Sequence, residues 1–191
     1  MSMRPGVDQH RIEEFLQQLG RQFRRPGRVY LVGGTSVVYE GLRHQTLDIN
    51  LTFDIADEDH ASFIAVVRAL KEQLKLNIEE ASPADFIPLP AGYQDRCQFI
   101  GRYGQLDIFH FDLYSTALSK ITRGTEEDFA DVLSLLQAGH LAMPRLTQYF
   151  TEILPQFATA SLKQDPAEFQ RNFEILDEMW DTAQGGESTV P

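Results

Sequence analysis

The segment Val29–Phe53, VYLVGGTSVVYEGLRHQTLDINLTF, decides the fold of this chain. It begins with a short β-branched and aromatic run, breaks at two glycines, continues through an apolar segment of helix length and ends in an alternating run. β-branched and aromatic residues favour strands, and paired glycines permit a tight turn where the backbone approaches another group closely. The pattern therefore predicts a strand, a turn, a helix and a second strand.

Polar side chains flank this turn on both sides. Thr35 and Ser36 follow the glycines at the expected helix start, where free amide groups and the positive end of the helix dipole suit a phosphate. In the second strand, residues two apart face the same way, so we expect Asp48 and Asn50 to project together. The neighbouring apolar residues are expected to face the core: Leu47, Ile49 and Leu51.

The rest of the chain alternates between helical and strand-like patterns. Apolar residues recur at helical spacing over 8–23, 57–74, 114–121, 126–137 and 144–153, and in a last helix that opens at Asp165-Pro166. Strands are expected over 76–80 and in a hairpin of 97–102 and 105–112. These elements predict an α/β (α+β) fold, with a mixed sheet flanked by helices and a helical C-terminal part.

The expected organisation is one compact unit. Residues 1–140 would form the α/β domain, and helices over 141–183 would pack on the same unit. The polar and glycine-containing end, residues 184–191, is expected to be a flexible tail.

The motif resembles a known family of enzymes. Ordered residues match the signature of the minimal nucleotidyltransferases of the DNA polymerase β superfamily, including AbiEii-like bacterial toxin relatives: Gly33, Gly34, Thr35, Arg43, Thr46, Asp48 and Asn50. The resemblance continues through FIPLPAGYQDR (86–96) and ALSKITRGTEEDFAD (117–131). It implies a nucleotidyltransferase-like fold and transfer of a nucleoside monophosphate from a nucleoside triphosphate to a hydroxyl group. The acceptor, an RNA, a protein or a small molecule, is left open.

The resemblance also implies a metal site. In the family, an Asp-x-Asp pair and a third carboxylate on a neighbouring strand hold Mg²⁺ or Mn²⁺, so the implied catalytic residues and metal ligands are Asp48, Asn50 and Asp107. Asp107 is favoured as the third carboxylate because apolar residues flank it in a strand-like run. Asp112 is the alternative, although its place before a helical segment makes it an N-cap candidate.

Substrate contacts are implied at further matched positions. The implied nucleotide-binding residues are Gly33, Gly34, Thr35, Ser36, Arg43, Thr46, Lys120 and Arg123. A structural ion pair is the competing interpretation for the last two, because Asp128 and Asp131 follow them closely.

Asn50 stands where the family usually has its second aspartate. An amide oxygen can still bind Mg²⁺, but the site is one negative charge short. The alternative function is therefore a catalytically impaired nucleotidyltransferase-fold binding module, for example in a toxin–antitoxin or defence system. A third interpretation is an interaction protein that forms a homodimer through the aromatic stripe between Phe169 and Trp180.

Composition sets further limits. The formal net charge of −11 argues against a protein that coats nucleic acid. Residues 1–44 hold seven arginines against four acids, so the negative charge lies in the remainder. No apolar run approaches the ~20 residues needed to cross a bilayer, and we expect a cytoplasmic bacterial protein with no membrane partner. The single Cys97 excludes an internal disulfide.

Overall fold

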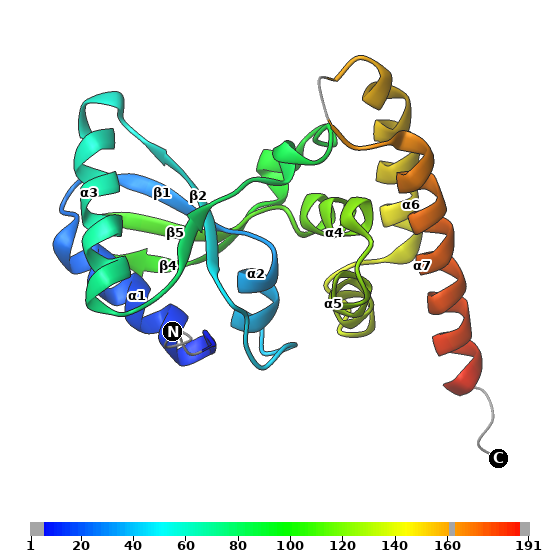
Figure 1. Ribbon diagram of the computed structural model, residues 1–191, viewed down its shortest axis with the longest axis horizontal. Coiled ribbons are helices and arrows are strands. Elements are labelled where there is room, and N and C mark those ends of the chain that lie inside the picture. The colour runs from blue at the N-terminus through cyan, green and yellow to red at the C-terminus, as the bar shows by residue number, and fades with distance from the viewer. Residues whose placement is uncertain (1–5, 161–162, 188–191) are drawn as a thin grey trace. The chain divides into compact units, whose positions relative to one another are not determined.

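The computed structural model describes residues 6–160 and 163–187 (Figure 1). The chain divides into two compact units: unit 1 comprises Met1–Ser82 and Gly92–Asp112, and unit 2 comprises Pro83–Ala91 and Leu113–Pro191. The expected boundary at residue 140 therefore falls within unit 2, between two of its helices.

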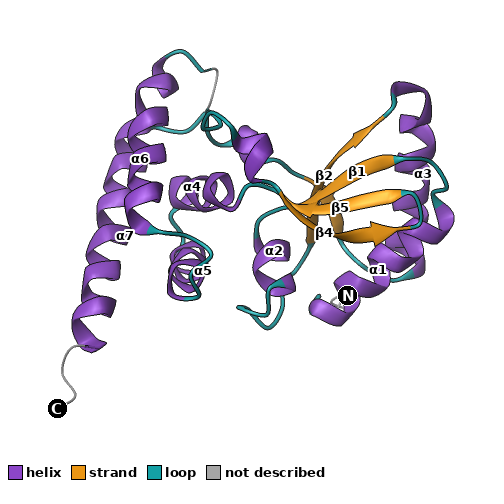
Figure 2. Ribbon diagram, turned by 180° about the vertical axis from the view of Figure 1, so that it is seen from behind, coloured by secondary structure: helices purple, strands orange, loops and turns teal. Residues whose placement is uncertain are grey.

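Unit 1 is built on a mixed five-stranded sheet of order β3-β2-β1-β5-β4 (Figure 2). The strands are β1 (Gly27–Leu31), β2 (Ile49–Ile55), β3 (Ile78–Glu80), β4 (Gln98–Tyr103) and β5 (Leu106–His110). The central β1 pairs antiparallel with β2 and parallel with β5. At the two edges, β3 runs parallel to β2, and β4 forms the expected antiparallel hairpin with β5. This confirms the predicted α+β class with a mixed sheet.

Helices α1 (Gln9–Gln22) and α3 (Asp57–Gln73) supply the hydrophobic core on one face of the sheet. The side chain of Asp8 accepts a hydrogen bond from the Arg11 backbone amide and so caps α1. Phe15 of α1 and Phe63 of α3 are fully buried, and the burial of each such side chain contributes about 1.5–3 kcal/mol. Short α2 (Gly34–Tyr39) follows β1, and the 3₁₀ turn η2 (Tyr93–Arg96) precedes β4.

Strand alternation gives the sheet two different faces. Val29, Leu31 and Ile108 point into the core under α1 and α3, whereas their neighbours Tyr30 and Phe109 point to the opposite face and are half-buried. The expected inward position of Leu47 is wrong, since its side chain is 77% exposed. The reason is that β2 begins only at Ile49, so the two-residue alternation does not extend back to this loop position.

Unit 2 is helical. It contains α4 (Leu113–Arg123), α5 (Glu126–Gln137), α6 (Met143–Ile153) and α7 (Pro166–Glu187), with 3₁₀ turns η1 (Pro83–Asp85) and η3 (Leu154–Ala158). Nine of the eleven residues of α4 are buried, which makes it the central helix of the unit. Helix α7 continues through Glu187 into the expected tail, and residues 188–191 lie outside the described residues. Within 6–160 and 163–187, no helix is both long and apolar enough for a membrane span.

Candidate functional site

The Gly33–Gly34 turn connects β1 to α2 at one end of the central strand. Gly33 has φ +60° and ψ −135°, a conformation that residues with a Cβ rarely adopt. A Cβ on Gly34 would lie 3.0 Å from Oγ1 of Thr46 and 3.2 Å from Nη1 of Arg43. The missing side chains therefore let Arg43 and Thr46 approach the turn backbone.

The next two residues of the motif hold the turn in place. Thr35 Oγ1 accepts a 2.8 Å hydrogen bond from the Asn50 amide, and Ser36 Oγ donates a 2.9 Å bond to the Leu31 carbonyl. Both side chains are fully buried, so their hydroxyl groups face the fold and not an open surface. Helix α2 spans six residues, which is shorter than the helix expected to direct a strong dipole at a phosphate.

Asp48 and Asn50 lie beside this turn, with Asp48 immediately before β2 and Asn50 within it. Oδ1 of Asp48 accepts a hydrogen bond from Nδ2 of Asn77, and the same nitrogen lies 3.5 Å from Oε1 of Glu79. Glu79 is the register partner of Asn50 in the parallel β2–β3 pair, so these two side chains project from the same face. The site thus contains a second carboxylate, from Glu79, beside the position where Asn50 lacks one.

Glu79 and Asn77 were not identified from the sequence. Residues 76–80 were expected to form a strand, but nothing in NIEE indicates which strand it pairs with or in which register. A parallel β2–β3 pairing in the observed register would have placed Glu79 beside Asn50, because partners in parallel strands face the same side.

The structure does not bring Asp107 to this group. Asp107 of β5 is the register partner of Arg28 in β1, and Arg28 is the partner of Asp54 in β2. Asn50 lies four residues before Asp54 in β2. This corresponds to about 13 Å along the strands. Asp107 instead forms a 2.7 Å ion pair with Arg102, and the Arg102 guanidinium lowers the pKa of the Asp107 carboxyl.

Asp112, the alternative third carboxylate, follows β5 at the end of the sheet that carries the Gly-Gly turn. The ladder continues past β5, since the Phe111 amide donates a 3.0 Å bond to the Leu31 carbonyl. Asp112 is fully buried, and Arg96 donates bonds of 3.1 and 2.9 Å to its two oxygens. Its carboxylate is thus already neutralised by a guanidinium group of the same unit.

Lys120 and Arg123 belong to a polar cluster in unit 2. Nζ of Lys120 lies 2.7 Å from Asp131 and 3.3 Å from Asp128, and Arg123 donates two hydrogen bonds to Asp128. Burial raises the pKa of Asp128, but hydrogen bonds from Arg123 and Thr125 outweigh it, so the pKa is lowered overall. The structural ion pairs that competed with a substrate role for Lys120 and Arg123 are therefore present.

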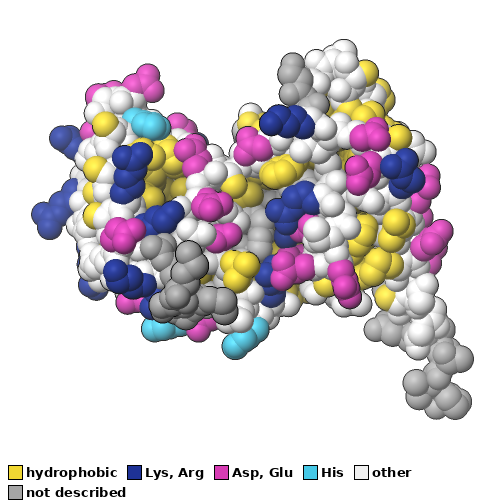
Figure 3. Space-filling model, in the orientation of Figure 1, with side chains coloured by type: hydrophobic (Ala, Val, Ile, Leu, Met, Phe, Trp, Pro, Cys, Tyr) yellow, Lys and Arg dark blue, Asp and Glu magenta, His cyan; other side chains and the backbone are white. Residues whose placement is uncertain are grey.

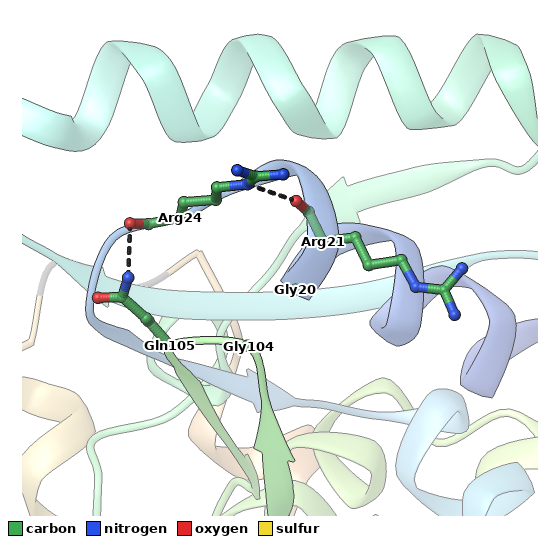
Figure 4. A pocket seen from close by; sticks show the side chains of 5 residues that line it. All are labelled: Gly20, Arg21, Arg24, Gly104 and Gln105. Atoms are coloured by element: carbon green, nitrogen blue, oxygen red, sulfur yellow. Dashed lines mark hydrogen bonds between the residues drawn. The ribbon is translucent and has the colours of Figure 1, made fainter.

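A separate shallow hollow lies at the other end of the sheet (Figure 4). Its lining residues are Gly20, Arg21, Arg24, Gly104 and Gln105. The Gln105 side chain donates a 2.9 Å bond to the Arg24 carbonyl, and Arg24 Nε donates a 3.4 Å bond to the Arg21 carbonyl. The hollow lies next to the first residues of β1 and β5, which are Gly27 and Leu106, whereas Gly33 follows the last residue of β1. The hollow therefore forms no part of the candidate site.

Fold and site together define an α+β protein that gathers glycines, an arginine and oxygen ligands at one end of a mixed sheet. The chain belongs to the family described as nucleotidyltransferase of unknown function (DUF6036), whose model matches residues 10–180. This match supports a nucleotidyltransferase and covers most of both units. No curated protein and no solved structure matches the chain.

Proposed function

We propose that the protein transfers a nucleoside monophosphate from a nucleoside triphosphate to a hydroxyl group, with a divalent cation as cofactor. The observation that carries this proposal is the clustering of Arg43, Asp48, Asn50 and Glu79 around the Gly33–Gly34 turn in a member of a nucleotidyltransferase family. Nucleotidyl transfer depends mainly on positioning and charge neutralisation, which such a cluster supplies.

The turn would hold the triphosphate. The open backbone at Gly33 and Gly34 allows close approach of phosphate oxygens, and Arg43 extends its guanidinium group to within contact distance of Gly34. Thr46 is buried beside the turn and would fix the position of its backbone. Thr35 would act indirectly, by tying the turn to the backbone of Asp48 and Asn50.

The donor set at this site fits Mg²⁺ or Mn²⁺. Hard divalent cations prefer oxygen ligands, and the carboxylates of Asp48 and Glu79 and the amide oxygen of Asn50 are all of this kind. Asn77 Nδ2 lies within hydrogen-bond distance of both carboxylates, so the two carboxylates are close enough to share one positively polarised group. When bound, the cation would neutralise phosphate charge and orient the reacting oxygens.

Asp107 fits this cation site less well than Glu79. Its carboxylate is bonded to Arg102 and lies several residues from Asn50 along the sheet. Among residues 6–160 and 163–187, no three His, Cys, Asp or Glu side chains gather around a common point. The proposed ligands are therefore two carboxylates and one amide, with no third carboxylate.

Asn50 supports one alternative on the same fold, a nucleotide-binding module that has lost transfer and acts through a protein partner, for example an antitoxin. The amide keeps an oxygen ligand but supplies no charge. Restoration of the charge in an Asn50→Asp variant discriminates the two functions, since the variant would gain turnover only if the remaining machinery is intact.

Calorimetric titration of ATP, GTP, CTP and UTP, each with Mg²⁺ and then Mn²⁺, tests the proposal. We expect cation-dependent binding in the wild type that is lost in Asp48→Asn and weakened at least tenfold in Glu79→Gln. Glu80→Gln is the matched control, because Glu80 is the next residue of the same strand and is the register partner of core-facing Leu51. Transfer would then be followed as nucleotide-dependent release of pyrophosphate with total RNA and with the protein itself as acceptors.

Two results would contradict the proposal. Absence of binding for all four nucleotides, in both wild type and Asn50→Asp, would remove the nucleotide site. Binding that is equal in Asp48→Asn and wild type would place the site elsewhere in the protein.

A further inference from the structure

A row of aromatic rings crosses the face of the unit 1 sheet opposite the core. Tyr30 of β1 stacks on Phe109 of β5 at a centroid distance of 5.4 Å, and Phe99 of β4 meets Phe109 edge-on at 5.5 Å. At one end, Phe111 contacts Tyr30 at 6.1 Å and stacks on Tyr93 of η2 at 5.4 Å. We name Tyr30, Phe99 and Phe109 the aromatic platform; it spans three adjacent strands, about 10 Å.

The platform is most accessible at Phe99. Phe99 is 60% exposed, and Tyr30 and Phe109 are half-buried, whereas Phe63 on the core side is fully buried. Phe99 thus leaves most of its apolar surface to solvent although its ring packs edge-on against Phe109. Large exposed apolar groups arranged in this way are typical of a binding surface and not of a core.

The platform is continuous with the candidate site. Asn50 and Thr52 project from β2 to the same face as Tyr30, since the intervening Leu51 is in the core. The Val32 amide donates a 3.1 Å bond to the Asn50 carbonyl, so the strand that carries Tyr30 lies directly beside Asn50. A ligand held by its phosphates at the Gly-Gly turn can therefore extend over Tyr30 and Phe109 without leaving this face.

Polar groups border the rings on the far side. Arg28 and Asp54 are register partners on this face, one step beyond Tyr30 and Thr52. Burial raises the pKa of Tyr30, and a hydrogen bond from the nearby Arg28 guanidinium opposes that effect. Donors and acceptors thus border the aromatic rings, and a few polar groups beside an apolar surface suit a planar heteroaromatic ring.

We propose that the aromatic platform binds the base of the nucleoside triphosphate, by stacking on Tyr30 and Phe109 with Phe99 as a side wall. This inference rests on the proposed function for the position of the phosphates. A single base matches the surface better than a nucleic acid strand, since the rings cover only three strands and the chain has a net charge of −11, which repels a polyphosphate backbone. Stacking is tolerant of base identity because every base has a π-face.

Substitutions on the two faces of the sheet test the inference. Phe109→Leu and Phe99→Ala remove platform rings, and Phe53→Leu is the matched control because Phe53 lies in β2 on the core face, against Phe63. Phe99→Ala alters an exposed side chain and is expected to fold even if Phe109→Leu does not. Binding of ATP with Mg²⁺, of inorganic tripolyphosphate with Mg²⁺ and of adenosine alone would be measured by calorimetry and by NMR titration.

The expected result is a selective loss of the base contribution. Platform variants should bind ATP and adenosine about 5- to 100-fold more weakly than wild type and Phe53→Leu, with unchanged tripolyphosphate binding. Unchanged ATP and adenosine binding in both platform variants overturns the inference while leaving the proposed function intact. Adenosine binding that is weakened in both platform variants supports the platform, and ATP binding in the wild type that is no tighter than adenosine binding would count against the phosphate site of the proposed function. If the wild type binds neither ATP nor adenosine, the inference is overturned, and the titration of all four nucleotides with wild type and Asn50→Asp decides the proposed function.

Discussion

Two polar clusters of this chain, one in each unit, place their carboxylates in opposite environments. In unit 2, Asp128 and Asp131 are buried beside the buried Lys120 and the half-exposed Arg123, so two negative charges meet two positive charges. In unit 1, Asp48 is partly exposed and Glu79 is exposed, and the neutral amide group of Asn77 bridges their carboxylates.

The difference separates a structural cluster from the proposed ligand site. A buried carboxylate requires a paired cation, because an unpaired charge in a low-dielectric interior costs several kcal/mol. Carboxylates near solvent are hydrated, so they are stable without a paired cation and can bind one from solution. The unit 2 cluster is therefore complete within the fold, and the unit 1 cluster is suited to bind a positive ligand.

Removal of the buried cation should have the largest effect. Lys120→Met leaves two buried carboxylates without their shared ammonium group, and we expect a loss of about 3–5 kcal/mol in the free energy of unfolding. Urea denaturation would measure it. Arg123→Met is the comparison, with a smaller loss expected because the Arg123 side chain is 47% exposed. Equal losses in the two variants would show that Lys120 is not the centre of the cluster.

Addition of ligand should stabilise the protein through the unit 1 cluster and not through the unit 2 cluster. A nucleoside triphosphate with Mg²⁺ at 100 times its Kd should stabilise the wild type by about 2.7 kcal/mol, because it binds only the folded state. Asp48→Asn should show no such increase in stability. Lys120→Met, if it folds, should be stabilised by the ligand to the extent that it still binds the nucleotide. Thermal denaturation with and without ligand gives the readout, and stabilisation of Asp48→Asn would contradict the assignment.

Acid should weaken the unit 2 cluster with a predictable sign. The folded-state pKa of Asp128 is lowered, so its contribution to stability is present above its unfolded pKa of about 3.9 and is lost as pH falls through the lower folded value. The stability gap between wild type and Asp128→Asn should therefore narrow below about pH 4. Unfolding in urea from pH 7 to pH 3 tests this, with exposed Glu126→Gln as control. A stability difference between wild type and Asp128→Asn that grows in acid would show that the folded-state pKa of Asp128 is raised and not lowered.

The smallest effect is expected for Asp48→Asn without ligand. Asp48 is partly exposed and near the carboxylate of Glu79, so loss of its charge should change the free energy of unfolding by no more than about 0.5 kcal/mol. Together with the loss of nucleotide binding, a near-neutral result would separate function from stability at this position. A loss of 2 kcal/mol or more, of the size found for buried groups, would instead make Asp48 structural.

The sequence predicted the fold well where local patterns dominate. The hairpin expected from residues 97–102 and 105–112 is observed as β4 and β5, and helical spacing gave 126–137 as observed for α5. Leu47 was misplaced, because alternation indicates a face only within a strand, and hydrogen bonding begins β2 two residues later. The parallel pairing of β3 with β2 depends on tertiary contacts that no local pattern encodes.

The candidate site was predicted in part for the same reason. Gly33, Gly34, Arg43, Thr46, Asp48 and Asn50 are close in sequence, and the structure brings them together at one turn. Residues from distant strands were harder to place. Asp107 has the expected apolar neighbours, but the β1–β5 register sets it opposite Arg28, while Glu79, whose neighbours resemble no motif, lies beside Asn50.

The path of the chain has a consequence for inheritance. Residues 83–91 leave the sheet unit and join the helical unit, where the Ala91 amide donates a 2.7 Å bond to Glu152 and Phe86 lies under the Arg123 guanidinium, before the chain returns at Gly92. Neither unit is a continuous stretch of polypeptide. A gene fragment that encodes one unit alone would omit part of it or carry part of the other, so exchange of single units between proteins by recombination is disfavoured. Both units are then expected to have been inherited together, in agreement with one family model that extends over residues 10–180.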